Sequence, residues 1–90
     1  MEFEWDTKKE RANLRKHGIS FSTASLVFSD TDRKEKLDET NLDEERWITV
    51  GLVDGEEIVV VYTMRAGVMR LISAREADKY EREDYWRGSV

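Results

Sequence analysis

The stretch WITVGLVDGEEIVVVYTMRAGVMRLISA, residues 47–74, decides the fold because it predicts three consecutive β-strands. Asp54-Gly55 lies between the first two strands, and this dipeptide favours a two-residue type I′ hairpin turn. Ala66-Gly67 separates the second strand from the third. The middle strand is apolar on both faces, so we expect it to be central in an antiparallel meander and covered, at least in part, on both sides. The expected strands are Trp47–Val53, Glu57–Met64 and Val68–Ala74.

A short strand and a helix are predicted at the N-terminal end of the chain. Phe3 and Trp5 alternate with acidic residues, as in a half-buried strand. Asp6 is a suitable N-cap for a helix over residues 7–17, and Gly18 is a typical residue at which a helix ends. Because most residues of this helix are charged, we expect it to pack lightly.

A second, shorter helix and a polar connection are expected before the meander. Ser20 or Ser22 can cap the helix, in which four apolar residues recur on one face. Residues 29–46 are polar and rich in acidic groups, and we expect a short edge strand near residues 35–37. The apolar face of the second helix consists of Phe21, Ala24, Val27 and Phe28.

The last predicted element is a C-terminal helix. Ser73 and Glu76 have the S-x-x-E spacing of a capping box, so we expect this helix to begin there and to run to about Trp86. An N-terminal strand, two helices, an antiparallel sheet with a three-stranded meander and a final helix belong to the α+β class. The 90 residues are too few for two cores, so residues 1–90 are expected to form one domain.

The composition excludes several classes of protein. The chain has no cysteine, which excludes disulfides, thiolate metal sites and a cysteine nucleophile. The longest apolar run, residues 58–62, is far shorter than the roughly 20 residues needed to span a membrane. No signal peptide is recognisable, so we expect a cytoplasmic protein. The net charge of −5 is unusual for a protein that coats nucleic acid, so any RNA contact must be a local basic cluster.

Few residue patterns in the chain can carry catalysis. One histidine and no cysteine cannot supply a nitrogen or sulfur ligand set, and no glycine-rich phosphate loop is present, so no metal or cofactor is expected. Metal-free RNA cleavage needs a base for the 2′-hydroxyl, donors for the charge that develops on the phosphorane, and an acid for the leaving oxygen. Histidine suits proton transfer and arginine suits phosphate. The candidates are Lys16, His17, Arg65, Arg70 and Arg75.

Each candidate also has a purely structural interpretation. His17 ends a helix, where a histidine often interacts only with the helix dipole. Arg70 can pair with a carboxylate across the sheet, and Arg75, expected in the first turn of the last helix, can bond the acidic loop. Tyr80 is more typical of the edge of a core than of catalysis. The acidic residues between positions 38 and 45 have no fixed spacing for a metal, so a solvated loop is the favoured interpretation.

Together these segments resemble the BrnT toxin family. The motifs F-E-W-D, K-H-G-I-S-F, E-R-W, V-V-Y-T-x-R and R-L-I-S-A-R occur in the order expected for that family and extend over nearly the whole chain. Their combination is highly specific. The residues that carry the resemblance are Phe3-Glu4-Trp5-Asp6, Asn13, Lys16-His17-Gly18-Ile19-Ser20-Phe21, Ala24, Val27-Phe28, Glu45-Arg46-Trp47, Gly51, Val60-Val61-Tyr62-Thr63, Arg65, Arg70-Leu71-Ile72-Ser73-Ala74-Arg75, Ala77, Glu81-Arg82 and Tyr85.

The resemblance implies a RelE-like α+β fold and a metal-independent, ribosome-independent endoribonuclease that inhibits translation and growth. It also implies neutralisation by a BrnA-type antitoxin that carries a ribbon–helix–helix part, so that DNA is bound only through the antitoxin complex. The expected product is a 2′,3′-cyclic phosphate. The residues at matching positions, and so the implied catalytic candidates, are Arg65, Arg70, Arg75, His17 and Lys16. We add Arg46, Tyr62 and Tyr80 as candidates for substrate binding.

Two other functions compete with this interpretation. The acidic balance of the chain fits a subunit that has weak or no catalytic activity and acts only by binding its antitoxin in a repressor complex. Direct DNA binding by the isolated chain is the third hypothesis. The chain has no helix-turn-helix signature, and its negative charge is unfavourable for DNA binding.

Overall fold

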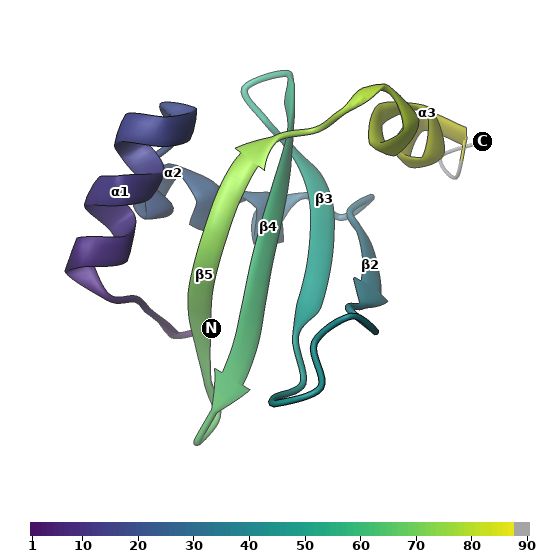
Figure 1. Ribbon diagram of the computed structural model, residues 1–90. Helices are drawn as coiled ribbons and strands as arrows, with labels where there is room; N and C mark the ends of the chain where they lie inside the picture. The colour runs from purple at the N-terminus through teal and green to yellow at the C-terminus, as the bar shows by residue number, and fades with distance from the viewer. Residues whose placement is uncertain (88–90) are drawn as a thin grey trace.

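A computed structural model of the chain describes residues 1–87 and shows an α+β arrangement (Figure 1). A five-stranded sheet in the order β1-β5-β4-β3-β2 forms one layer, and the helices pack around it. The class predicted from the sequence is therefore confirmed. The elements are β1 (Phe3–Glu4), α1 (Thr7–His17), α2 (Phe21–Ala24), the 3₁₀ helix η1 (Ser25–Ser29), β2 (Lys34–Leu37), β3 (Trp47–Val53), β4 (Glu56–Arg65), β5 (Val68–Glu76) and α3 (Lys79–Arg87).

Strands β2 to β5 form an antiparallel meander in which β4 pairs on both sides. The Asp54-Gly55 turn confirms the predicted hairpin, because the two residues have φ angles of 49° and 80°. Ala66 and Gly67 repeat this geometry between β4 and β5, with φ angles of 50° and 80°. The three strands and the short edge strand are confirmed, and both β4 and β5 are longer than predicted.

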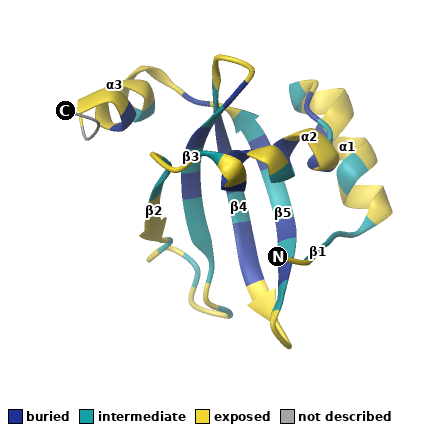
Figure 2. Ribbon diagram, turned by 180° about the vertical axis from the view of Figure 1, so that it is seen from behind, coloured by how far each residue is buried: buried dark blue, intermediate teal, exposed yellow. Residues whose placement is uncertain are grey.

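The hydrophobic core lies between the sheet and the segment formed by α2 and η1. Figure 2 shows this segment crossing one face of the sheet. The rings of Phe28 and Tyr62 meet edge to face, with centroids 5.3 Å apart. All four apolar residues predicted to share a helix face are buried, which confirms that prediction. Within residues 1–87, α3 is the only helix near the opposite face, so most of that face stays open (Figure 1).

The two edges of the sheet end in different ways. At one edge, β2 has only four residues, and Lys34, Glu35 and Lys36 are charged. At the other edge, β1 pairs in parallel with only two residues of β5, Met69 and Arg70. The C-terminal half of β5 therefore needs another hydrogen-bond partner for the backbone groups on the side away from β4.

Asn13 supplies that partner from helix α1. Its amide nitrogen donates to the carbonyl oxygens of Ala74 (2.8 Å) and Ile19 (3.0 Å), and its amide oxygen accepts from the Ala74 N–H (3.1 Å). The side chain thus forms the pair of hydrogen bonds that a neighbouring strand would form. Asn13 is 7% exposed, whereas the apolar Leu14 beside it is 49% exposed. The light packing predicted for α1 is therefore confirmed, since Asn13 is its one buried residue and attaches the helix through polar contacts.

The ends of the first two helices follow the predicted capping chemistry. Asp6 accepts hydrogen bonds from the N–H groups of Lys8 and Lys9, and Gly18 ends α1 at a φ of 72°. Ser20, rather than Ser22, caps α2 by accepting from Thr23 N–H at 3.1 Å.

Gly51 allows η1 to approach β3 closely. A Cβ atom at this position would lie 2.8 Å from Val27 Cγ1 and 3.1 Å from the Val27 carbonyl oxygen. The absence of a side chain at Gly51 therefore permits the helical layer to sit directly on the middle of the strand.

The predicted start of the C-terminal helix is wrong. Ser73 and Glu76 lie in β5, where Ser73 pairs with Val61 and Glu76 with Ile58. Pairing along β4 and burial of Ala74 override the local S-x-x-E signal. The capping box is instead formed by Asp78 and Glu81: each main-chain N–H donates to the carboxylate of the other, at 2.8 Å and 2.9 Å.

Helix α3 is anchored by side chains on two other elements. The hydroxyl of the buried Tyr85 donates to the Asp30 carboxylate, which follows η1. The indole N–H of Trp86 donates to Glu57 on β4 at 2.9 Å. These bonds hold α3 over one corner of the sheet, near β2 and β3 (Figure 1).

We expect Asn13→Ala to lower the free energy of unfolding by about 2–4 kcal/mol, because it leaves three buried main-chain groups without a partner. Leu14→Ala is the matched control on the same helix and should cost less than about 1 kcal/mol despite removing more apolar surface. Urea unfolding followed by circular dichroism measures both values. Equal losses for the two variants would contradict the role given to Asn13.

Candidate functional site

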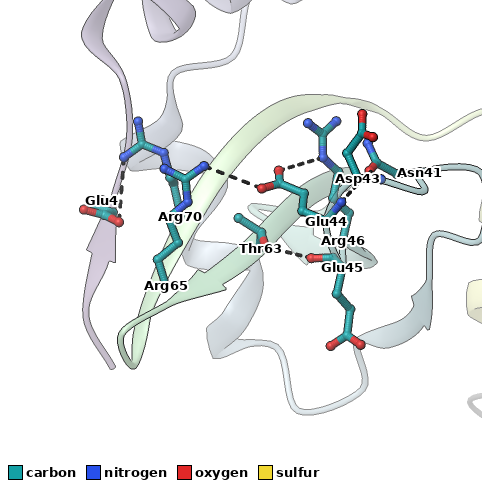
Figure 3. Close-up of polar contacts among 9 residues, drawn as sticks. All are labelled: Glu4, Asn41, Asp43, Glu44, Glu45, Arg46, Thr63, Arg65 and Arg70. Carbon is teal, nitrogen blue, oxygen red and sulfur yellow. Dashed lines mark hydrogen bonds and ion pairs between the residues drawn. The ribbon is translucent and has the colours of Figure 1, made fainter.

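Three arginines from separate segments gather at one end of the open sheet face (Figure 3). Arg46 directly precedes β3, Arg65 ends β4, and Arg70 lies in β5 opposite Thr63. We call Arg46, Arg65 and Arg70 the arginine cluster. Their side chains are 31%, 56% and 26% exposed, so solvent and a ligand can reach part of each side chain.

Two carboxylates contact the arginine cluster. Glu44 lies between two of its members: Oε1 accepts from Arg46 Nε at 3.0 Å, and Oε2 lies 3.5 Å from Arg65 Nη2. Glu4, on β1, lies 3.7 Å from Arg70 Nη1. The predicted cross-sheet pairing of Arg70 with a carboxylate is thus confirmed. Exposed pairs of this kind contribute little to stability, so an anionic ligand can replace them.

The loop that carries Glu44 has a defined shape. The side-chain oxygen of Asn41 accepts hydrogen bonds from the main-chain N–H groups of Asp43 (3.1 Å) and Glu44 (3.0 Å). Thr63 on β4 donates its hydroxyl to the Glu45 carbonyl oxygen at 2.7 Å. These bonds attach the loop to the central strand. At its C-terminal end the predicted solvated loop is therefore an ordered part of the site.

The charges around Glu44 keep it ionised. The hydrogen bond from Arg46 is the largest influence and lowers the pKa of Glu44, and Arg65 adds to this effect, while slight burial opposes it. Near neutral pH the cluster therefore holds three guanidinium groups and at least one carboxylate at the same end of the sheet.

Arg75 lies on the same face but apart from the cluster. It pairs with Val59 of β4, four residues from Thr63, which corresponds to about 13 Å along the strand. Its two terminal nitrogens donate to the two oxygens of Glu81 at 2.7 Å each. The expectations that Arg75 begins the last helix and bonds the acidic loop are wrong, because β5 extends past it and its partner belongs to α3.

Lys16 and His17 lie at the end of α1, away from the cluster. His17 is one helical turn beyond Asn13, which bonds Ala74, so both residues lie near the Arg75 end of β5. Among residues 1–87, neither side chain makes a hydrogen bond or an ion pair. The structure thus separates these two candidates from Arg65 and Arg70.

The two candidate tyrosines have different environments. Tyr62 is 6% exposed on the core face, where its hydroxyl donates to Glu35 at 3.1 Å. Burial, followed by the nearby Glu35 carboxylate, raises the pKa of Tyr62 to about 12. Tyr80, in the first turn of α3, is 75% exposed. Neither tyrosine lies with the arginine cluster, and Tyr62 faces the opposite side of the sheet.

Sequence reasoning missed Glu44, Glu4 and Thr63 as parts of this site. Glu44 stands two residues from Arg46, a spacing that is common in polar loops and carries no distinctive signal. Thr63 and Glu4 fall within the motifs that resemble the family, but their roles depend on strand register. Register could not be obtained from the motifs alone.

Residues 1–87 contain neither a metal-binding cluster nor a membrane-spanning helix. This part of the chain contains no group of three or more histidine, aspartate or glutamate side chains placed to hold a metal ion. None of its helices is long and apolar enough to cross a membrane.

The meander sheet, with α2 and η1 across one face and the arginine cluster on the other, defines an α+β protein consistent with the RelE-like fold. Residues 5–81 match the family described as the ribonuclease toxin BrnT of type II toxin–antitoxin systems. The chain therefore belongs to the BrnT family, as the motifs indicated. A search of curated proteins found no match.

We expect Glu81→Gln to lower the free energy of unfolding at pH 7 by about 1 kcal/mol, because it weakens the bond to Arg75 and the cap of α3. The bond from Arg75 lowers the pKa of Glu81 below its ordinary value of 4.5, with partial burial opposing. Its stabilising contribution is therefore complete above pH 4.5 and is lost as the pH falls through the lowered folded-state pKa.

Urea midpoints between pH 7 and pH 3 test this expectation, with Glu83→Gln as an exposed control on the same helix. The variant at position 81 should lose less stability than the parent in the acidic range. Identical pH dependence in parent and variant would show that Glu81 does not contribute to the pH dependence of stability.

Proposed function

We propose that this chain is a metal-independent endoribonuclease that acts as the toxin of a type II toxin–antitoxin pair in the cytoplasm. Membership of the BrnT family supports ribonuclease activity and the presence of a cognate antitoxin. The observation that carries the proposal is the arginine cluster on the open sheet face. It supplies the local positive surface that a chain of net charge −5 needs in order to hold RNA.

The proposed reaction is internal transesterification at a phosphate held by the cluster. The planar forks of Arg46, Arg65 and Arg70 match phosphate oxygens and neutralise the charge that develops on the phosphorane. Guanidinium groups provide this charge without a metal ion. The 2′-oxygen attacks the adjacent phosphorus, so the products are a 2′,3′-cyclic phosphate and a 5′-hydroxyl end.

The placement of the other candidates supports the choice of this end of the sheet. Arg75 is held by Glu81, and Lys16 and His17 lie near the same end of β5. Among the candidates, Arg46 and Arg65 come from different segments to the same carboxylate, Glu44, and Arg70 lies in the next strand, opposite Thr63 (Figure 3). We therefore assign the scissile phosphate to the cluster, and we expect smaller effects from substitutions at Arg75, His17 and Lys16.

The proposed partner is a BrnA-type antitoxin with a ribbon–helix–helix part, and the complex rather than this chain would bind operator DNA. Family membership supports the existence of an antitoxin. The net charge of −5 favours a partner segment that is basic and disfavours direct binding of DNA by the isolated chain.

One observation favours a second candidate function, an antitoxin-binding subunit with weak or no catalysis. Every member of the arginine cluster is paired with a carboxylate, and these pairs compete with phosphate. Such a chain would fold and bind its antitoxin but would leave RNA intact.

Incubation of the purified chain with labelled single-stranded RNA in EDTA tests the proposal. We expect the parent to cleave, and Arg65→Ala and Arg70→Ala each to lower kcat/KM by about 100-fold or more, because each removes a donor from the developing charge. Arg70→Lys should retain intermediate activity, since it keeps the charge and loses the fork. Arg15→Ala, an exposed arginine on α1, is the control and should cleave like the parent.

Circular dichroism confirms that each variant is folded. A folded parent that leaves RNA intact in EDTA would support the antitoxin-binding candidate instead. Cleavage by the parent that is lost in Arg75→Ala but kept in Arg65→Ala and Arg70→Ala would move the site to the other end of β5.

A further inference from the structure

The proposed reaction also needs a group that accepts the proton of the attacking 2′-hydroxyl. Guanidinium groups remain protonated in proteins and cannot do so. Tyr62 points into the core, and His17 lies near the other end of β5. Among residues 1–87, the carboxylates in contact with the cluster are Glu44 and Glu4.

Glu44 is the better placed of the two carboxylates. It contacts Arg46 at 3.0 Å and Arg65 at 3.5 Å with different oxygens, whereas Glu4 contacts only Arg70, at 3.7 Å. Figure 3 shows the Glu44 carboxylate between the two guanidinium groups. A phosphate held by Arg46 and Arg65 would therefore lie directly against Glu44. A general base must come within hydrogen-bond distance of the proton that it takes, and the attacking 2′-oxygen is next to that phosphate.

The fold holds Glu44 by main-chain bonds that a substrate does not need to disturb. Asn41 accepts from Glu44 N–H at 3.0 Å, and the buried Thr63 binds the next residue of the loop at 2.7 Å. The side chain is 31% exposed, so it can leave its arginine partners without uncovering the core. Glu45, directly beside it, directs its side chain away from the cluster (Figure 3).

We propose that Glu44 is the general base of the RNA cleavage reaction, an inference that rests on the proposed function. The 2′-oxygen forms a bond to phosphorus while its proton passes to the Glu44 carboxylate. The bond between phosphorus and the 5′-oxygen then breaks, and the 5′-oxygen takes a proton from water. The hydroxide left behind takes the proton from Glu44 and restores the carboxylate. No water is consumed overall, and the products are those of transesterification.

The electrostatic surroundings agree with this role. The bond from Arg46 lowers the pKa of Glu44, so the proton-accepting form is present throughout the neutral range. A base of this kind gives a rate that falls in acid, as the carboxylate becomes protonated below its ordinary value of 4.5. Arg46 and Arg65 remain positively charged on either side and favour the phosphorane after the proton has moved.

Glu44→Gln tests the proposal because it keeps the size of the side chain and one hydrogen-bond acceptor and removes its basicity. We expect kcat for single-stranded RNA to fall by about 100-fold or more. We also expect the acidic limb of the pH–rate profile to disappear. Binding of 2′-O-methyl RNA, which lacks the attacking hydroxyl, should be unchanged or tighter, because a negative charge beside the arginines is gone. Glu44→Asp should recover part of the rate, and Glu45→Gln is the matched control.

Each other outcome overturns the proposal in a distinguishable way. Faster cleavage by Glu44→Gln would mean that the carboxylate only competes with phosphate. Parallel losses of cleavage and of 2′-O-methyl RNA binding, with the acidic limb retained, would mean that Glu44 only positions the arginines. Unchanged cleavage would contradict the role of Glu44 as general base but would leave the proposed ribonuclease activity standing. A parent chain that cleaves no RNA would instead contradict the proposed function, and with it the role of Glu44 as general base.

Discussion

The carboxamide of Asn13 determines how the helical layer meets the sheet. Its hydrogen bonds to Ala74 and Ile19 join the middle of α1, the edge of β5 and the turn before α2. With these three segments joined, α2 and η1 lie across one face of the sheet, and Gly51 lets them approach β3 without a clash. The opposite face is consequently left free over most of its length (Figure 1), and the arginine cluster lies at one end of it (Figure 3).

Much of this arrangement could be predicted because short-range rules coincide with the final fold. Asp6 and Gly18 bound α1 as expected, and Asp54-Gly55 makes the expected turn. The start of α3 could not be predicted, because the Ser73 signal competes with pairing along β4 and loses. The burial of Asn13 in place of Leu14 could not be predicted either, for a similar reason. Its stabilisation comes from a residue 61 positions away, and no local pattern records that distance.

The candidate site shows the same division between local and long-range information. The residue types expected of a ribonuclease were evident, and Arg65 and Arg70 do lie close together because one hairpin carries both. Arg46 joins them through the register of β3, while Arg75 is separated by its position along β5 and by Glu81. A list of basic residues therefore could not distinguish the two ends of the face. The pairing of the strands does so.

The edges of the sheet have a consequence for the behaviour of this chain at high concentration. Unpaired strand edges can template pairing between copies of a protein and so promote aggregation. Here one edge is a four-residue strand with three charged side chains, and the other is closed partly by β1 and partly by the Asn13 amide. A side-chain amide cannot be extended by another strand. Self-association through β-sheet extension is therefore discouraged at both edges, even when the chain accumulates without a partner.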